Sequence, residues 1–335
     1  MRRRTLIKNT DEFYSYPLIN GKVGEAVFFD SNNKALVTMT QSEITSAVDG
    51  YVPIGIVVVP AEHNVYGDGT CGVMSLHFMS TETPDTGSGL YQNVCWGDDS
   101  VDTSLTNYTH YNSLGNSEVP SSTIIEARND NNGVLPTDAI SEDCTQVLSL
   151  DGVAWYNINQ FFQNQQEYLI PSPFNADGSR NEAYYTTVYS TANAFSDFDG
   201  VGNTKILTDL ATTQSDWKTA STITNSSSNR YYPAACCCWR YHTKGTNQGS
   251  WYLPSIGEMG YMSHKISEFD WIRETIFDKY SLGSYDYITD YYNVLTYISS
   301  TEYNTGWVQG IMLNTNTLYS TLKSESCLCL AFIRL

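Results

Sequence analysis

One short run of residues, Ile-Gly-Ile-Val-Val-Val-Pro from Ile54 to Pro60, most constrains how this 335-residue chain can fold. The run is apolar and rich in β-branched side chains, which predicts a strand that is buried on both faces. Such a strand needs a partner on each edge and cover over each face. Because a small sheet cannot supply all of this cover, we expect other subunits to complete its core. The neighbouring strands that we expect in this sheet are residues 25–29, 34–39 and 71–78.

The charge of the chain is strongly acidic and unevenly distributed. The net charge is −18, and residues 80–200 hold seventeen acidic and two basic side chains, a net charge of −15. A body with this charge repels DNA and anionic lipid, which argues against nucleic-acid binding. No run approaches 18 apolar residues, so we expect no membrane span. Residues 1–8 are basic but lack the apolar segment of a signal peptide, which predicts synthesis and folding in a cytoplasm.

Changes in composition along the chain predict three parts. Residues 1–80 form an N-terminal β module that we expect to anchor and oligomerise the protein. Residues 81–150 are rich in Ser, Thr, Asn, Asp and Gly, and they predict an acidic connecting region of long loops on the outside of the assembly. Residues 151–335 predict a binding domain. The 25 tyrosines suit either an exposed recognition surface or the strands of a β-rich fold, and both interpretations stay open.

The C-terminal part contains two helix signals. Pro233 suits the first turn of a short helix that ends near Lys244 and Gly245. Ser255 and Glu258 have the spacing of a capping box, and the apolar residues after them predict one amphipathic helix of about five or six turns. Alternating apolar residues then predict three strands, so the fold class is α+β. These strands are expected at residues 295–302, 306–313 and 327–334.

Two short motifs in this part carry a family resemblance. Their residues are Trp251, Leu253, Pro254, Ser255, Glu258, Ser299, Ser300, Glu302 and Trp307. The pattern resembles C-type-lectin-fold domains of the kind related to formylglycine-generating enzyme and to phage tropism proteins. The resemblance covers roughly the C-terminal half. It implies two helices packed on a twisted antiparallel sheet, with long irregular loops, and it says little about the ligand.

The N-terminal residues carry a second resemblance. Residues 24–30 and 51–60 are similar to the opening of capsid-borne fibre proteins of crAss-like phages. This implies a head fibre or decoration protein on the capsid surface of a tailed phage, attached to capsid proteins through the N-terminal module. It also implies a homo-oligomer, with a trimer favoured over a dimer, that binds bacterial or mucosal glycan. The alternatives are a bacterial cell-surface adhesin and, third, an oxidase of the formylglycine-generating type.

Cysteines are the residues that most suggest catalysis. Cys327 and Cys329 share one face of a strand, as a copper-binding pair would, but their surroundings lack the family's Arg-Cys spacing. The three cysteines at 236–238 splay around a helix and cannot converge on one metal ion. We therefore expect reduced, structural thiols and partial exposure of this triplet. The chain has no nucleotide-binding loop and no nucleophile motif, so we expect neither a cofactor nor an enzyme.

A single weak metal candidate lies upstream. Asp197, Asp199 and Asn203 offer oxygen ligands for one calcium ion. The later acidic ligands of a calcium loop are missing, and an Asx turn before Gly200 is favoured.

Overall fold

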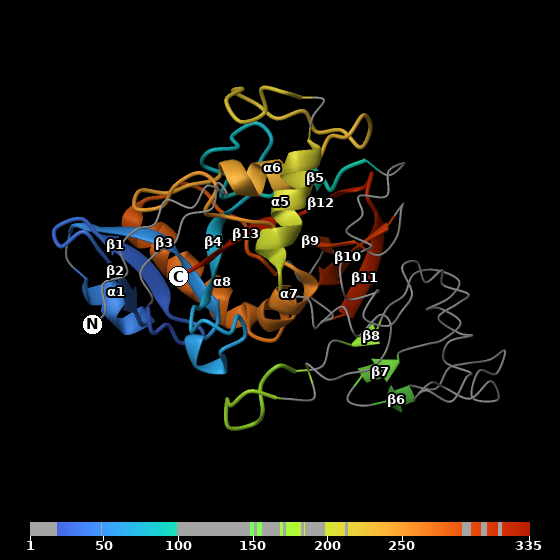
Figure 1. Cartoon of the computed structure of the whole chain (residues 1–335). Coiled ribbons are helices and arrows are strands. Elements are labelled where there is room, and N and C mark those ends of the chain that lie inside the picture. Colours follow the sequence, from blue (N-terminus) through green and yellow to red (C-terminus); the bar gives the residue numbers. More distant parts are fainter. Residues whose placement is uncertain are drawn as a thin grey trace.

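The computed structural model describes most of the chain outside the acidic connecting region. The described residues are 19–47, 49–98, 148–150, 153–155, 168–169, 172–181, 184, 198–211, 214–289, 296–302, 307–313 and 317–335. They form a mixed α+β structure in which a few helices pack on antiparallel sheets (Figure 1). The predicted α+β class is confirmed. The predicted arrangement of residues 99–147 lies outside the described residues.

The elements follow one another along the chain as shown in Figure 1. The helices are α1 (Gln41–Ser46), the 3-10 turn η1 (Ala61–His63), α5 (Gly200–Leu210), α6 (Pro233–Arg240), α7 (Ile256–Ser263) and α8 (Ile266–Tyr280). The strands are β1 (Ala26–Asp30), β2 (Ala35–Met39), β3 (Tyr51–Val59), β4 (Gly72–Phe78), β5 (Val94–Cys95), β6 (Leu148–Leu150), β7 (Val153–Trp155), β8 (Tyr168–Leu169), β9 (Thr296–Glu302), β10 (Trp307–Met312), β11 (Thr317–Leu322), β12 (Ser326–Cys327) and β13 (Leu330–Arg334).

A five-stranded sheet contains all four strands that the N-terminal sequence predicts. Its order is β13-β4-β3-β1-β2, and every neighbouring pair is antiparallel. The fifth strand comes from the other end of the chain, because Phe332 of β13 pairs with Met74 of β4. The two strands lie side by side in Figure 1. The described part of the predicted N-terminal module, residues 19–80, therefore shares its sheet with β13, and the anchoring role of the module stays a prediction.

Strand β3 is covered on both faces by helices of the same chain. The side chains from Ile54 to Val59 have 0% exposure. On one face, Ile56 and Val58 share a cluster with apolar residues of α7 and α8. On the other face, Ile54 and Val57 share a cluster with α6 and Trp251. The expectation that another subunit must cover this strand is wrong, because α6, α7 and α8 of the same chain bury it. No local signal near β3 indicates that C-terminal helices fold back over it.

The remaining strands form a six-stranded sheet and a short pair. The six-stranded sheet has the order β6-β7-β8-β11-β10-β9, and β12 pairs with β5. All three predicted C-terminal strands are present, and the last prediction, 327–334, is divided between β12 and β13. The sheet that contains β9 and β10 packs against α5 and α7, which places it beside the helices that cover β3 (Figure 1).

The predicted long amphipathic helix is two helices. The chain leaves helical geometry at His264 and Lys265, between α7 and α8. The apolar spacing continues through this break, since Met262 and Ile266 both join the same core cluster. Periodicity alone therefore could not reveal the turn. Helix α6 begins at Pro233 as predicted but ends at Arg240, earlier than the predicted end near Gly245.

Helix α7 begins with the predicted capping box. The Ser255 side chain accepts from the Glu258 amide, and the Glu258 carboxylate accepts from the Ser255 amide at 2.8 Å. Both residues are 0% exposed. Helix α1 has a second capping box, Thr40 and Glu43, which is largely exposed.

We expect Ser255→Ala to lower the free energy of unfolding by about 1–2 kcal/mol, because it removes a cap in a buried setting. Thr40→Ala is the matched control, and we expect a loss of about 0.5 kcal/mol since water can replace the exposed cap. Urea unfolding of both variants measures the difference. Equal losses for the two variants would contradict the importance of burial.

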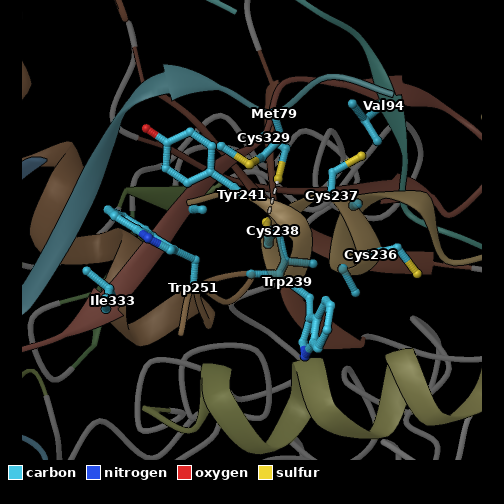
Figure 2. Packing of buried hydrophobic residues seen from close by; sticks show 14 of the residues in the cluster. Met79, Val94, Cys236, Cys237, Cys238, Trp239, Tyr241, Trp251, Cys329 and Ile333 are labelled. Carbon is cyan, nitrogen blue, oxygen red and sulfur yellow. Dashed lines mark hydrogen bonds between the residues drawn. The ribbon is translucent and has the colours of Figure 1, made fainter. Parts of the chain in front are cut away.

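The described cysteines are all free and buried. They are Cys71, Cys95, Cys236, Cys237, Cys238, Cys327 and Cys329. Figure 2 shows the α6 triplet within the core, where the sulfur of Cys238 lies 3.5 Å from that of Cys329. The expected exposure of the triplet is wrong, because α6 packs against α5, β5 and β13 with its whole length buried. The remaining cysteine, Cys144, lies outside the described residues.

Burial makes these thiols poor nucleophiles. It raises the pKa of Cys71 and of Cys327 to about 12, and it raises the pKa of the triplet thiols further above the ordinary range. We expect iodoacetamide at pH 8 to leave these cysteines unmodified in the native protein and to modify them all in urea. Mass spectrometry of the alkylated peptides measures this. Rapid native modification of Cys236–Cys238 would contradict the packing of α6.

Candidate binding surface on helix α8

The motif residues that carry the family resemblance lie together in the core. The segment before α7 meets β9 there, because the Ser300 backbone amide donates to the Pro254 carbonyl at 2.7 Å. The Ile256 amide donates to the Thr301 hydroxyl at 3.0 Å. All but one of the nine predicted signature residues are buried, and the exception, Trp307, is partly buried. These residues hold the fold together and are not available to a ligand.

Two buried acidic residues of these motifs have specific partners. Glu258 accepts a hydrogen bond from the Tyr252 hydroxyl at 2.7 Å, and burial raises the pKa of Glu258. Glu302 forms an ion pair with Lys323 in which both side chains are 0% exposed. The Lys323 ammonium lies 5.0 Å from the ring centre of Trp96. Their surroundings are those of structural charges, desolvated and paired.

Two of the three calcium candidates, Asp199 and Asn203, make contacts that stabilise the fold. Asp199 is the N-cap of α5, and its carboxylate accepts from the Gly202 amide at 3.1 Å. The side-chain amide of Asn203 donates to the Ser300 hydroxyl at 3.0 Å. Asp199 thus begins a helix at the place where the sequence favoured an Asx turn before Gly200, and Asp197 lies outside the described residues. Within the described part of the chain, no three His, Cys, Asp or Glu side chains gather as a metal site would require.

A small cavity opens beside α6. It lies among residues that include Trp217, Tyr232 and Cys236, and its volume is ≈ 10 Å³. A cavity of this size has room for about one water molecule. A sugar ring or any other organic ligand is far larger. This cavity is therefore too small to be a site for such a ligand.

The exposed large apolar side chains of the described residues gather around one helix. They are Leu90, Trp271 and Tyr287, with 44%, 58% and 46% exposure. The Tyr287 hydroxyl donates to the carboxylate of Glu274 at 3.0 Å, and Glu274 lies one turn after Trp271 on α8. We call this region the aromatic surface. It consists of Leu90, Tyr91, Trp271, Glu274, Tyr285 and Tyr287.

Contacts connect Tyr91, Tyr285, Tyr287 and Glu274 within this surface, and Trp271 lies one helical turn before Glu274 on α8. The Tyr91 hydroxyl donates to the carbonyl of Tyr287. The rings of Tyr285 and Tyr287 meet edge to face at 5.7 Å, and Tyr285 also packs on Phe277 of α8 at 5.0 Å. The loop after α8 and the loop after β4 are thus joined into one surface.

A buried arginine beneath the aromatic surface fixes both loops. Arg273 is 0% exposed. Its guanidinium donates to the carbonyl of Leu76 in β4 at 2.6 Å, to that of Gly89 at 3.2 Å, and to that of Asp286. It also lies over the ring of Phe78, 4.7 Å from the ring centre. One side chain of α8 therefore links the sheet to both loops.

A buried carboxylate also holds the loop after α8. Asp270 is 5% exposed, and it accepts from the amides of Ile288 and Thr289 and from the Thr289 hydroxyl. Burial raises the pKa of Asp270, and the hydrogen bonds oppose this shift. Because buried charges cost free energy unless they are well paired, these two residues indicate strict positioning of the aromatic surface.

Sequence analysis did not identify this surface. Trp271 stands directly after Asp270 and off the apolar positions of α8, which is the one signal that could have found it. An exposed tryptophan on the polar side of an amphipathic helix is unusual in a structural residue and common at binding sites. The polar groups of the surface are tyrosine hydroxyls and one carboxylate, which suit hydrogen bonding to a ligand rather than nucleophilic attack.

A histidine below the surface should make stability depend on pH. His77 packs on the ring of Phe277, and burial, reinforced by the charge of Arg273, lowers the pKa of His77 from 6.5 to about 4. Between these pH values, His77 is therefore protonated in the unfolded chain and neutral in the folded chain. Stability should be lost as the pH falls from about 6.5 to about 4, by up to about 3 kcal/mol.

The variant His77→Gln removes this titration, so its stability should change less than that of the wild type over the same interval. Urea unfolding at pH 7, 5.5 and 4 measures the difference between the two proteins at each pH. Parallel losses in both would show that His77 is not the titrating group.

Comparisons of the chain with protein-family models, curated proteins and solved structures found no match. Among the described residues, no helix combines the length and the apolar character that crossing a membrane requires.

Proposed function

We propose that this chain is a non-catalytic binding protein of a virion: a head fibre or decoration protein of a crAss-like tailed phage that displays a C-type-lectin-like domain to bacterial or mucosal glycan. The observation that supports binding is the aromatic surface on α8, which keeps Trp271 and Tyr287 exposed while Arg273 and Asp270 hold their loops. Fixed aromatic side chains contribute large contact area at a low entropic cost.

The lectin-like fold is part of the proposal. The two motifs that carry the resemblance pack on each other. The first, around Trp251–Glu258, leads into α7, and the second, around Ser299–Glu302, lies in β9. Helices α7 and α8 pack against antiparallel strands of both sheets. These features are compatible with the two helices and the twisted sheet that the resemblance implies.

The third candidate, an oxidase of the formylglycine-generating type, has little support. Its chemistry would require reactive cysteines near the end of the chain. Cys327 and Cys329 are 7% and 0% exposed, and burial raises the pKa of Cys327 to about 12, so few thiolates form at neutral pH. Oxidation of a cysteine peptide in the presence of copper would revive this candidate.

The assembly that we propose is a homo-oligomer, with a trimer favoured over a dimer, attached to capsid proteins through its N-terminal residues. The strand β2 lies at one edge of the five-stranded sheet and is partly exposed, which offers a surface for such contacts. Light scattering of the whole protein tests the oligomeric state.

The location is tested by mass spectrometry of gradient-purified virions and by antibody labelling of intact particles. We expect the protein in the virion fraction and antibody at the capsid. Recovery only in the surface fraction of uninfected bacterial cells would favour the alternative, a bacterial adhesin.

A further inference from the structure

We propose that the aromatic surface binds a neutral saccharide, with a sugar ring on Trp271 and sugar hydroxyls donating to Glu274. This inference rests on the proposed binding function and names its ligand class and its site. Three properties of the surface lead to it: its exposed apolar side chains, its hydrogen-bonding groups and its charge.

The apolar contact is provided by two side chains that water now covers. Trp271 is 58% exposed and Tyr287 is 46% exposed, and neither is needed to fill the core. One face of a pyranose ring carries C–H groups and can lie flat on an indole, which removes apolar area from water on both molecules. An aromatic side chain also loses little conformational freedom when it is bound.

The hydrogen-bonding groups, Glu274 and the tyrosine hydroxyls next to it, lie one helical turn from Trp271. One carboxylate oxygen of Glu274, Oε1, accepts from the Tyr287 hydroxyl at 3.0 Å. The Tyr287 hydroxyl is also hydrogen-bonded to the Tyr285 hydroxyl, so three polar groups lie in a row. A carboxylate has about four acceptor positions in all, so Glu274 can accept further hydrogen bonds. Sugar hydroxyls are donors and match this capacity. A ligand without hydrogen-bond donors would leave these acceptor positions of Glu274 unfilled.

The charge of the surface selects against anionic ligands. Glu274 and Asp278 face outward on α8, and the whole chain has a net charge of −18. Among the residues that the structure describes, the cations of α8 beside this surface are already engaged. Arg273 is buried beneath the surface, and the Lys279 ammonium donates to three backbone carbonyls of the α1 region. A sulfated, phosphorylated or uronic-acid saccharide would meet uncompensated carboxylates here, whereas a neutral one would not.

The support beneath the surface fits this use. Saccharide binding by a few stacked rings is weak unless the rings are already in place, because ordering mobile side chains costs free energy. The hydrogen bonds of Arg273 and Asp270 to the two loops provide this order before the ligand arrives. The same buried charges would be a costly way to hold a loop with no binding role.

The test uses the full chain and immobilised oligosaccharides of two kinds at physiological ionic strength. The neutral set consists of hexose and N-acetylhexosamine oligomers, and the anionic set consists of uronic-acid and sulfated oligomers of the same length. We expect binding to members of the neutral set alone. Trp271→Ala and Glu274→Gln should each raise Kd about tenfold or more, and Trp271→Phe should raise it less because a smaller ring remains.

Two controls separate folding from binding. Asp209→Asn removes an exposed carboxylate from α5, far from this surface in sequence, and it should leave Kd unchanged. Thermal melts of all variants should coincide with the wild type within a few degrees, because the substituted side chains are exposed or partly exposed.

The outcomes distinguish this inference from the proposed function. Binding of anionic saccharides only, binding of no neutral saccharide, or neutral binding that Trp271→Ala leaves intact would each overturn the inference. In the last case the protein would still bind glycan, through another surface. Absence of the protein from purified virions, together with neutral binding that Trp271→Ala abolishes, would overturn the virion role and leave the binding site in place.

Discussion

Replacing Lys323 with methionine should lower the free energy of unfolding by about 3–5 kcal/mol, because Glu302 would remain in the core without this counter-charge. Both side chains of this ion pair are 0% exposed, and the ammonium also lies over Trp96. Methionine keeps most of the length and apolar volume of the lysine. The loss of stability therefore comes from the missing positive charge and not from a cavity. Urea unfolding followed by circular dichroism measures it.

An exposed ion pair on α5 provides the matched control. Lys205 and Asp209 lie 2.9 Å apart, with 42% and 62% exposed side chains. Lys205→Met should change the free energy of unfolding by less than about 1 kcal/mol, because water solvates both charges. The double variant Lys323→Met with Glu302→Leu should recover much of the lost stability, since neither charge then remains buried. Equal losses for Lys323→Met and Lys205→Met would mean that the core pair is solvated.

Replacing Arg273 with leucine should cost about 3–5 kcal/mol and should also loosen the aromatic surface. The substitution removes the donor of hydrogen bonds to three carbonyls, and it leaves the carbonyl of Leu76 buried without this donor and those of Gly89 and Asp286 partly buried without it. Hydrogen exchange should therefore accelerate at residues 284–289 and 87–91 more than in β4. Urea unfolding provides the stability.

The conservative variant Arg273→Lys tests whether geometry or charge matters. A lysine keeps the positive charge but cannot reach three carbonyls that surround a planar guanidinium, so we expect an intermediate loss. Glu274→Gln, at the next position on the exposed side, should leave both stability and hydrogen exchange near those of the wild type. Unchanged exchange in the loops of Arg273→Leu would show that this residue does not position the surface.

Local sequence signals predicted most of the elements. The β-branched run at β3, the proline at the start of α6 and the capping box of α7 each depend on a few adjacent residues, and each is present in the structure. Long-range pairing was missed because it has no local signature. Nothing in the sequence near β4 indicates that its free edge is taken by β13, and the two predicted domains therefore share one sheet.

The candidate site was hidden for a related reason. Helical periodicity identifies inward positions by their apolar side chains, so Asp270 and Arg273 count as solvent-facing residues in such a pattern. Their burial becomes clear only when the loops that they hold are in place. The motifs that sequence reasoning did identify, around Trp251 and Ser299, proved to be part of the core.

The pairing of β4 with β13 also affects how the protein is made. A hydrogen bond in this pair joins residues 256 positions apart, from the Ala331 amide to the Ser75 hydroxyl. At a synthesis rate of about 5–20 residues per second, a nascent chain waits roughly 10–50 s between making β4 and making its partner. Throughout that interval, β4 presents an unpaired apolar edge beside β3, the kind of edge that recruits other chains. A nascent chain of this protein is therefore open to such association until β13 emerges, and we expect messages that end before β13 to yield aggregates rather than smaller folded proteins.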